Sequence, residues 1–257
     1  MSPPSSSNHI APSNLNHCSG PPQNVKKQKC YYFSMTLEKI SNLTDLYNHI
    51  IELNKKHFPN SSLMPIPSGG ELNNPKYMFV FINPTIRNIS TNPNWKGIRA
   101  PFIGTKNIWR VFHKAGQFEN NLMLEIEKRK TWDESFAKKV YDFLKSKSFN
   151  FTNIVKWAGE NADLPNRVKI KIFLPSLIRE IEIVKPQNII TFGLIPYEAL
   201  TLQKIKLEEY YQNCMRNEKA SKTEVTIGRI QTNIIPCYFP IGRGNPKRAV
   251  EILKLLK

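Results

Sequence analysis

The chain has 257 residues and carries 37 Lys and Arg against 20 Asp and Glu, which gives a formal net charge of +17. This charge is larger than solubility requires and favours a polyanionic partner, nucleic acid first and an anionic membrane surface second. Because no apolar run approaches the roughly 18 residues of a membrane-spanning helix and residues 1–29 lack the apolar core of a signal peptide, we expect no membrane association and an intracellular location, cytoplasmic or nuclear.

Residues 1–30 form a polar segment dominated by Ser, Pro, Asn and Gln. Such a composition buries too little apolar surface to offset the entropy cost of ordering, so we expect a disordered tail. The lysines near the end of this tail either touch nucleic acid nonspecifically or only keep the chain soluble. Residues 31–257 are sufficient in length and apolar content for one domain.

Helical and strand patterns alternate after the tail. Apolar residues recur at helical spacing from Thr36 to about Asn54, and a Pro/Ser/Gly stretch at 59–70 closes that helix. Continuous apolar runs predict strands at 77–82, 151–155, 188–192 and 233–237. Further helical patterns lie at 106–115, 133–145, 173–184, 196–202 and 246–256.

Two details refine the helix predictions. Pro175 lies inside the pattern at 173–184, so that helix begins near the proline or kinks there. Asn245 and Pro246 suit the N-cap and the first position of the last helix. Because the strands are too continuously apolar to be half exposed, we predict an α/β fold: a three-layer α/β/α single domain with a mostly parallel four-stranded central sheet.

The cysteines and histidines give no sign of a metal site. Cysteines occur at positions 18, 30, 214 and 237 without a C-x-x-C pair, and the five histidines are equally scattered. Reduced thiols are therefore expected. We predict neither a metal ion nor an organic cofactor.

Two long segments contain no Asp or Glu. The first runs between Leu72 and Phe118 and holds seven Lys or Arg, among them Arg87 and Lys106; the second runs from Val225 to Val250 and includes Lys247. Segments of this kind predict a surface that faces an anion. The alternative is that the lysines only solvate the surface.

Candidate site residues follow the predicted strands. Asn83 ends the run Phe79 to Ile82, Asn153 interrupts the second run, and the loop 238–244 follows the last. In open parallel sheets ligands bind beyond the carboxyl ends of the strands. We therefore expect these three elements to converge on one crevice.

These segments together resemble the uracil-DNA glycosylase superfamily, particularly its mismatch-specific uracil/thymine branch. The resemblance runs from about Lys76 to Leu253, and it is carried by F-I-N-P-T at 81–85, A-P-F-I-G at 100–104, N-I-W-R at 107–110, T-N-I-V-K at 152–156 and Y-F-P-I-G-R-G at 238–244. It implies a monofunctional DNA glycosylase that flips uracil, or a related deaminated or mismatched base, out of DNA and hydrolyses its N-glycosidic bond in base excision repair. We expect this enzyme to act as a monomer.

The resemblance also implies roles for single residues. Asn83 would position the attacking water, although an ordinary Asx turn is the alternative. Pro84 and Thr85 would border the base, and Thr85 stands where the family's G-I-N-P-G motif has glycine, so its side chain takes space that the base would use. Phe102 would stack on the flipped base, or else only pack in the core. Asn153 would pair with the edge of uracil, or with neighbouring backbone.

The late loop departs most from the family pattern. Family members usually have His-Pro-Ser or Asn-Pro-Ser there, and this chain has Phe239-Pro240-Ile241. Phe239 would border the base without donating a hydrogen bond. Ile241 or Arg243 would enter the duplex, while Gly242 and Gly244 would let the backbone approach phosphates.

Other interpretations stay open at this stage. A noncatalytic nucleic-acid-binding protein with the same fold would explain the missing glycines and the missing polar residue at 239. An unrelated Rossmann-like nucleotide enzyme lacks support because no G-x-G-x-x-G run is present. Some superfamily members carry an iron-sulfur cluster on four cysteines, and the twelve-residue separation of Cys18 from Cys30 does not match that arrangement.

Overall fold

The structure, a computed structural model, describes residues 35–159, 164–242 and 244–256. The tail predicted over residues 1–30 lies outside these ranges, and its disorder stays a prediction. Within the described ranges no helix combines the length and apolar character needed to cross a membrane.

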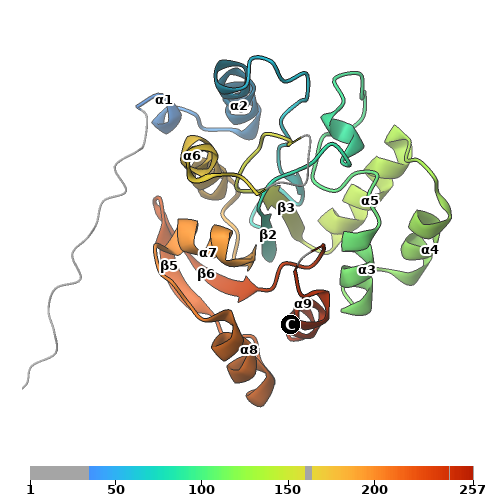
Figure 1. The fold of residues 1–257 in the computed structure, drawn as a ribbon, viewed down its shortest axis with the longest axis vertical. Coiled ribbons are helices and arrows are strands. Elements are labelled where there is room, and N and C mark those ends of the chain that lie inside the picture. Colours follow the sequence, from blue (N-terminus) through green and yellow to red (C-terminus); the bar gives the residue numbers. More distant parts are fainter. Residues whose placement is uncertain (1–34, 160–163, 243, 257) are drawn as a thin grey trace, which may run out of the picture. The chain divides into compact units, whose positions relative to one another are not determined.

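The described residues form an α/β fold around a mixed sheet with the strand order β1-β3-β2-β4-β6-β5 (Figure 1). Its strands are β1 Gly69–Gly70, β2 Tyr77–Phe81, β3 Phe149–Asn153, β4 Asn188–Phe192, β5 Thr223–Ile227 and β6 Ile230–Cys237. The four central strands run parallel, as predicted, while β1 and β5 pair antiparallel at the two edges.

The predicted number of four strands is wrong, because the described residues form a sheet of six strands. The strand β1 has only two residues, too few for any periodicity. The strand β5 is the outer strand of a hairpin at the edge of the sheet, so most of its residues are exposed. An exposed strand has no continuous apolar run and was therefore not predicted.

Helices lie on both faces of the sheet (Figure 1). One face is covered by α3 Asn107–Lys114, α4 Asn120–Lys128, α5 Glu134–Ser146, α8 Leu207–Arg216 and α9 Pro246–Lys254. The other is covered by α1 Met35–Glu38, α2 Leu43–His57, α6 Arg167–Val184 and α7 Leu194–Thr201. A short 3-10 helix, η1, spans Ile89–Thr91.

Alternation along the strands produces the two cores. In β2, Tyr77, Phe79 and Phe81 belong to the α3 side, whereas Met78 and Val80 belong to the α6 side. Successive side chains of a strand point to opposite faces, so a run of five buried residues supplies both cores at once. This double burial explains why the central strands could be predicted from apolar runs.

The helix predictions were right in place and less accurate in extent. Helices α4 and α8 were not predicted, and α6 begins at Arg167, where the side chain of Asn166 accepts a hydrogen bond from Lys169 N at 2.9 Å. Pro175 thus lies inside α6 instead of near its start. The start of α9 is confirmed, because Asn245 caps it and Pro246 is its first residue.

The four parallel strands end at one level. Phe81 pairs with Asn153, Val80 with Thr191, and Phe192 with Cys237. Backbone bonds continue just beyond the strands, from Ile154 N to Phe81 O at 2.9 Å and from Gly193 N to Cys237 O at 2.8 Å. The loops that leave these strands consequently start at one edge of the sheet.

Candidate active site

Three predicted elements meet at the carboxyl edge of the parallel strands. Asn153 of β3 pairs in register with Phe81 of β2, and Phe81 is two residues before Asn83. Gly193 follows β4, and side-chain atoms of Ile82 and of Phe239 each lie 3.9 Å from the position that a Cβ on Gly193 would take. The convergence of the loops after β2, β3 and β6 that the sequence predicted is therefore present in the fold.

Asn83 combines a local contact with a free acceptor. Its Nδ2 donates to the carbonyl of Pro84 at 3.1 Å, and that carbonyl also accepts from Gly159 N at 3.2 Å. Its Oδ1 has no partner among the described residues, and the side chain is half buried. The amide is thus held in place through its donor, while its acceptor is available to a water molecule or a ligand.

The residues after Asn83 are tied to the loop that follows β3. Thr85 forms an isolated parallel bridge with Gly159, and Ile86 N donates to Gly159 O at 3.2 Å. Pro84 is buried and Thr85 half buried. The N-P-T turn and the β3 loop therefore form one unit, which fixes Asn83 relative to Asn153.

Phe102 is held in a strained backbone conformation. Its φ is +66°, a region that bulky L residues rarely adopt. The Tyr141 hydroxyl donates to the carbonyl of Pro101, and Thr105 donates to the carbonyl of Phe102 from N and from Oγ1. Strain of this kind persists where surrounding contacts enforce it and is concentrated at functional sites.

The ring of Phe102 lies against the end of the sheet. It packs edge-on to Phe81, with centroids 4.5 Å apart and planes at 73°, and more distantly against Trp109. The side chain is half buried, so it contributes to the core and also keeps part of its surface accessible. Core packing and base stacking, the two roles weighed from the sequence, are compatible in this position.

Asn153 is the most unusual polar residue of the edge. Its side chain is 1 % exposed, yet neither Nδ2 nor Oδ1 has a hydrogen-bond partner among the residues that the structure describes. An unsatisfied buried polar group costs about 1 to 3 kcal/mol. Because it is in register with Phe81, its side chain lies on the same face of the sheet as that ring and Phe192. A free donor beside a free acceptor complements the C=O and N–H groups along one edge of a pyrimidine.

The late loop is shaped by a tight turn before α9. Asn245 N donates to the carbonyl of Phe239 at 2.9 Å, and Gly244 N donates to Ile241 O at 3.1 Å. A Cβ on Gly244 would lie 1.9 Å from Phe239 O, so only glycine fits there. Gly242 has a φ of +61° and open space around it. Arg243 lies outside the described residues.

Sequence reasoning missed a cluster that braces this loop. The guanidinium of Arg248 bonds to Glu208 and, at 2.8 Å, to the hydroxyl of Tyr238, and it stacks on the rings of Tyr211 and Tyr238 at 4.6 and 5.3 Å. Tyr238 directly precedes Phe239, so the cluster fixes where the loop begins. Glu208 is forty positions from Arg248, and no local motif links the two.

Several basic side chains of the acid-free segment at 73–117 are already engaged in contacts within the protein or lie away from this edge. Lys106 Nζ donates to Glu127 O at 2.6 Å, and Arg110 pairs with the Glu127 carboxylate. The Arg99 guanidinium binds backbone carbonyls of residues 90–95. Lys76 precedes β2, at the opposite end of the strands.

Several predicted DNA contacts remain accessible. Arg87 and Lys247 are exposed, and neither has a side-chain partner among the described residues. Ile241 is half exposed and Gly242 is exposed. Lys106 differs from them, because its ammonium group is already bound to the end of α4.

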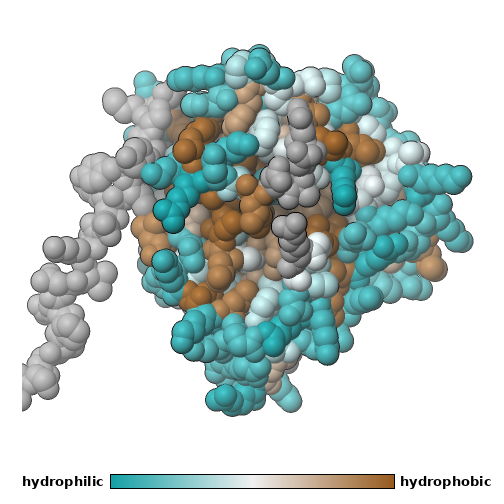
Figure 2. Space-filling view, in the orientation of Figure 1, coloured by the Kyte–Doolittle hydropathy of each residue, from teal (hydrophilic) through white to brown (hydrophobic). Residues whose placement is uncertain are grey.

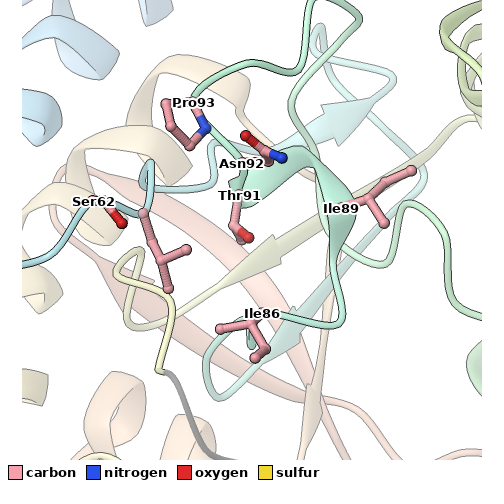
Figure 3. Close-up of a pocket in the computed structure, with 7 residues that line it drawn as sticks. Ser62, Ile86, Ile89, Thr91, Asn92 and Pro93 are labelled. Carbon is pink, nitrogen blue, oxygen red and sulfur yellow. The ribbon is translucent and has the colours of Figure 1, made fainter.

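An open pocket of 480 Å³ lies next to the N-P-T turn (Figure 3). It is lined by Ser62, Leu63, Ile86, Ile89, Thr91, Asn92 and Pro93. None of the predicted site residues lines this pocket. We therefore place the candidate site at the strand ends, where the unpaired amide of Asn153 lies, and not in the pocket.

The described residues contain no group of three or more His, Cys, Asp or Glu side chains that could hold a metal ion. Cys214 and Cys237 are buried free thiols, and burial raises the pKa of Cys237. Cys18 and Cys30 lie outside the described residues.

Comparison with known proteins identifies the class that this fold and site belong to. The family described as the uracil DNA glycosylase superfamily matches residues 67–257, most of the chain. The chain therefore belongs to that superfamily, as its motifs indicated.

One relative extends this comparison. A segment of 49 residues is 47% identical to the type-4 uracil-DNA glycosylase of Pyrobaculum aerophilum, and it covers 19% of this chain and 25% of that protein. The similarity thus spans a quarter of the relative's length. Neither comparison points specifically to the mismatch-specific branch, so that narrower placement is not supported.

We expect Asn153→Leu to raise the free energy of unfolding by about 1 kcal/mol, because it removes an unsatisfied buried amide and keeps similar volume. Asn188→Leu is the matched control at the other end of the sheet, since Asn188 Nδ2 donates to Lys76 O at 2.9 Å and its loss should destabilise the fold. Urea unfolding midpoints of both variants check this. A destabilised Asn153→Leu protein would mean that Asn153 has a structural partner.

Proposed function

We propose that this protein is a monofunctional DNA glycosylase that flips uracil, or a related deaminated or mismatched base, out of DNA and hydrolyses its N-glycosidic bond. The observation that carries the proposal is the buried side-chain amide of Asn153, which has no partner among the described residues. Asn153 pairs in register with Phe81, two residues before Asn83 and its free acceptor. Membership in the superfamily supports the reaction class. The work of such an enzyme is base excision repair, in the cytoplasm or nucleus.

Each site residue has a distinct task in this proposal. A base taken out of the stack has to be held by stacking and by hydrogen bonds to its edge. Phe102 provides an aromatic surface, and Asn153 donates to a carbonyl of the base and accepts from its N–H. Pro84 and Thr85 border the base and hold Asn83 in place, and the side chain of Thr85 narrows the space next to the base.

The chemistry then needs few protein groups. The C–N bond breaks with its electron pair moving to the base, water adds to the sugar carbon, and the proton lost by that water ends on the departing base. Asn83 Oδ1 orients the water by accepting one of its hydrogen bonds. Because an amide is a poor base, most of the rate must come from preorganised donors that stabilise the departing anion. This scheme uses no metal ion or organic cofactor.

The surface around the site suits DNA. Arg87 and Lys247 are exposed beside the two loops that we assign to the duplex.

Exposed aliphatic side chains occur on the first turn of α6, at Val168, and at the start of α7, at Leu194. Hydrophobic residues gather over α6 and α7 and the middle of the view in Figure 2, with hydrophilic residues around them. We assign Ile241 and Arg243 to the duplex stack and phosphates, and we propose that a monomer suffices.

A noncatalytic DNA-binding role is the second candidate. It is favoured by Phe239, whose apolar ring stands where the family's polar residue would donate to the departing base. Binding and flipping would survive this change, whereas the chemical step would lose one donor. The experiments below separate the two candidates.

The decisive measurement is base release from oligonucleotides that carry uracil, hypoxanthine or a thymine mismatch, followed by alkaline cleavage of the abasic sites. We expect Asn83→Ala to lower single-turnover release by about a hundredfold or more, because water is no longer oriented, and to leave DNA affinity unchanged. Asn94→Ala is the control, an exposed amide in a neighbouring loop. Wild-type release by Asn83→Ala would make Asn83 a turn residue only, and no release by the native protein would favour the noncatalytic role.

The second prediction concerns the apolar residue of the late loop. Phe239→His should raise single-turnover uracil release by about tenfold or more, because a hydrogen bond to the developing anion acts mainly in the transition state. Phe239→Leu is the matched control and should give no gain. Equal rates for the two variants would show that residue 239 does not face the departing base.

The third prediction concerns salt. Each phosphate contact contributes about 0.9 to the slope of log affinity against log salt concentration. The double variant Arg87→Ala, Lys247→Ala should therefore reduce that slope by about 2, whereas Lys76→Ala, at the other end of the strands, should leave it unchanged. Fluorescence anisotropy with a labelled duplex at several salt concentrations checks this. Equal slopes for the three proteins would place the duplex elsewhere.

A further inference from the structure

A lysine is buried completely beneath the candidate site. The side chains of Lys156 and Glu180 are 0% and 2% exposed, and Nζ lies 2.6 Å from Oε2. Thr152 Oγ1 donates to the same Oε2 at 2.6 Å, and Lys156 Nζ also donates to Thr152 Oγ1. Burial lowers the pKa of Lys156, and the adjacent Glu180 opposes that shift. We call these three residues the buried triad.

The buried triad brackets Asn153 in the sequence. Thr152 directly precedes it, and Lys156 follows it by three positions and reaches back to Thr152. The backbone between them is fixed at the end of β2, through Ile154 N to Phe81 O at 2.9 Å and Val155 N to Ile82 O at 3.0 Å. The chain on both sides of Asn153 is therefore anchored, to α6 by side chains and to β2 by backbone.

Asn153 itself makes none of these contacts. Its side-chain amide has no hydrogen-bond partner in the described part of the chain, so no hydrogen bond within that part sets its orientation. Thr152 faces α6, and successive side chains of a strand point to opposite faces, so Asn153 faces away from the buried triad. Any influence of the triad on Asn153 must pass through the backbone that the two residues share.

Stability alone does not account for a charged pair in this place. Helix α6 already buries Phe173, Leu177, Ile181 and Val184 against the sheet. Replacing a buried ion pair by apolar residues of similar volume is often neutral or stabilising, because both charges lose their hydration. A hydrogen-bonded charged pair differs from apolar packing because its bonds have preferred angles and therefore fix the relative orientation of the groups that they join.

We propose that Thr152, Lys156 and Glu180 are positioning residues that hold Asn153 in the orientation required to read the flipped base. This inference rests on the base-reading role proposed for Asn153. None of the three residues contacts the base. Their effect is on how narrowly the orientation of the Asn153 side-chain amide is fixed. Sites of this kind lose activity when the groups supporting them are loosened, even where the fold is retained.

The first test replaces the charges and keeps the volume. The double variant Lys156→Met, Glu180→Met should unfold within a few degrees of the native Tm, bind undamaged duplex equally well and release uracil at least about tenfold more slowly in single turnover. In an Asn153→Ala background the same double substitution should cause no further loss, because the residue that it positions is gone. A stable double variant with native activity, or losses that multiply, would overturn the proposal.

A second pair of variants covers the case in which the double variant does not fold. Thr152→Val keeps the shape of the side chain and the ion pair but removes the hydroxyl, whereas Thr152→Ser retains the hydroxyl. We expect slow release by Thr152→Val and near-native release by Thr152→Ser. Native release by Thr152→Val, or equal losses in the two variants, would make the contact irrelevant to the site.

The third readout does not depend on catalysis. The side-chain amide of Asn153, assigned in nitrogen-15 spectra by its loss in Asn153→Leu, should give one sharp pair of signals in the native protein. It should broaden or double in Thr152→Val and in the double methionine variant. Unchanged signals would overturn the proposal. Failure of the native protein to release any base would overturn the proposed function instead, and these spectra would still decide whether the triad orients Asn153.

Discussion

The site depends on the level ending of four parallel strands. Pairing of Phe81 with Asn153 and of Phe192 with Cys237 brings loops from four distant parts of the chain to one edge. Parallel strands in register also point equivalent side chains to the same face, so an amide at the end of β3 lies in one row with aromatic rings of β2 and β4. A slip of one residue in β3 would turn Asn153 toward α6 and Thr152 toward the site.

Aromatic packing makes this edge rigid. The rings of Phe81 and Phe192 stack with centroids 4.6 Å apart. The ring of Phe102, a residue with a left-handed backbone conformation, has its centroid 4.5 Å from that of Phe81. Rigidity is needed because the side-chain amide of Asn153 has no hydrogen bond to any described residue. In such a site the orientation of polar groups comes from neighbouring packing and anchored backbone. The packing of the two apolar cores offsets the free energy cost of burying the unpaired amide.

The sequence predicted the parallel strands well and the network around the site poorly, for physical reasons. A strand buried on both faces leaves an apolar run such as Tyr77–Phe81, and Asn83 follows that run closely. Asn153 was expected to interrupt a strand at 151–155, whereas it is the last residue of β3, Phe149–Asn153. Long-range polar partners leave no local pattern. Glu180 is 24 positions from Lys156, and Lys106 finds the carbonyl of Glu127 in a helix that was not predicted. The basic character of a segment therefore did not reveal which of its charges are free.

The positive field at this edge has a second source besides side chains. Helices α3, α6, α7 and α9 each follow a parallel strand, and none of these four has an acidic residue in its first turn, whereas α2, α5 and α8 do. The N-terminus of a helix carries about half a positive charge, which acidic residues ordinarily complement. Here α6 begins with the basic residues Arg167 and Lys169, and α9 begins with Lys247 and with Arg248, whose charge is already paired with Glu208. Helix ends that repel their own first turns are stabilised when an anion arrives, so DNA phosphates would relieve a repulsion that the free protein contains.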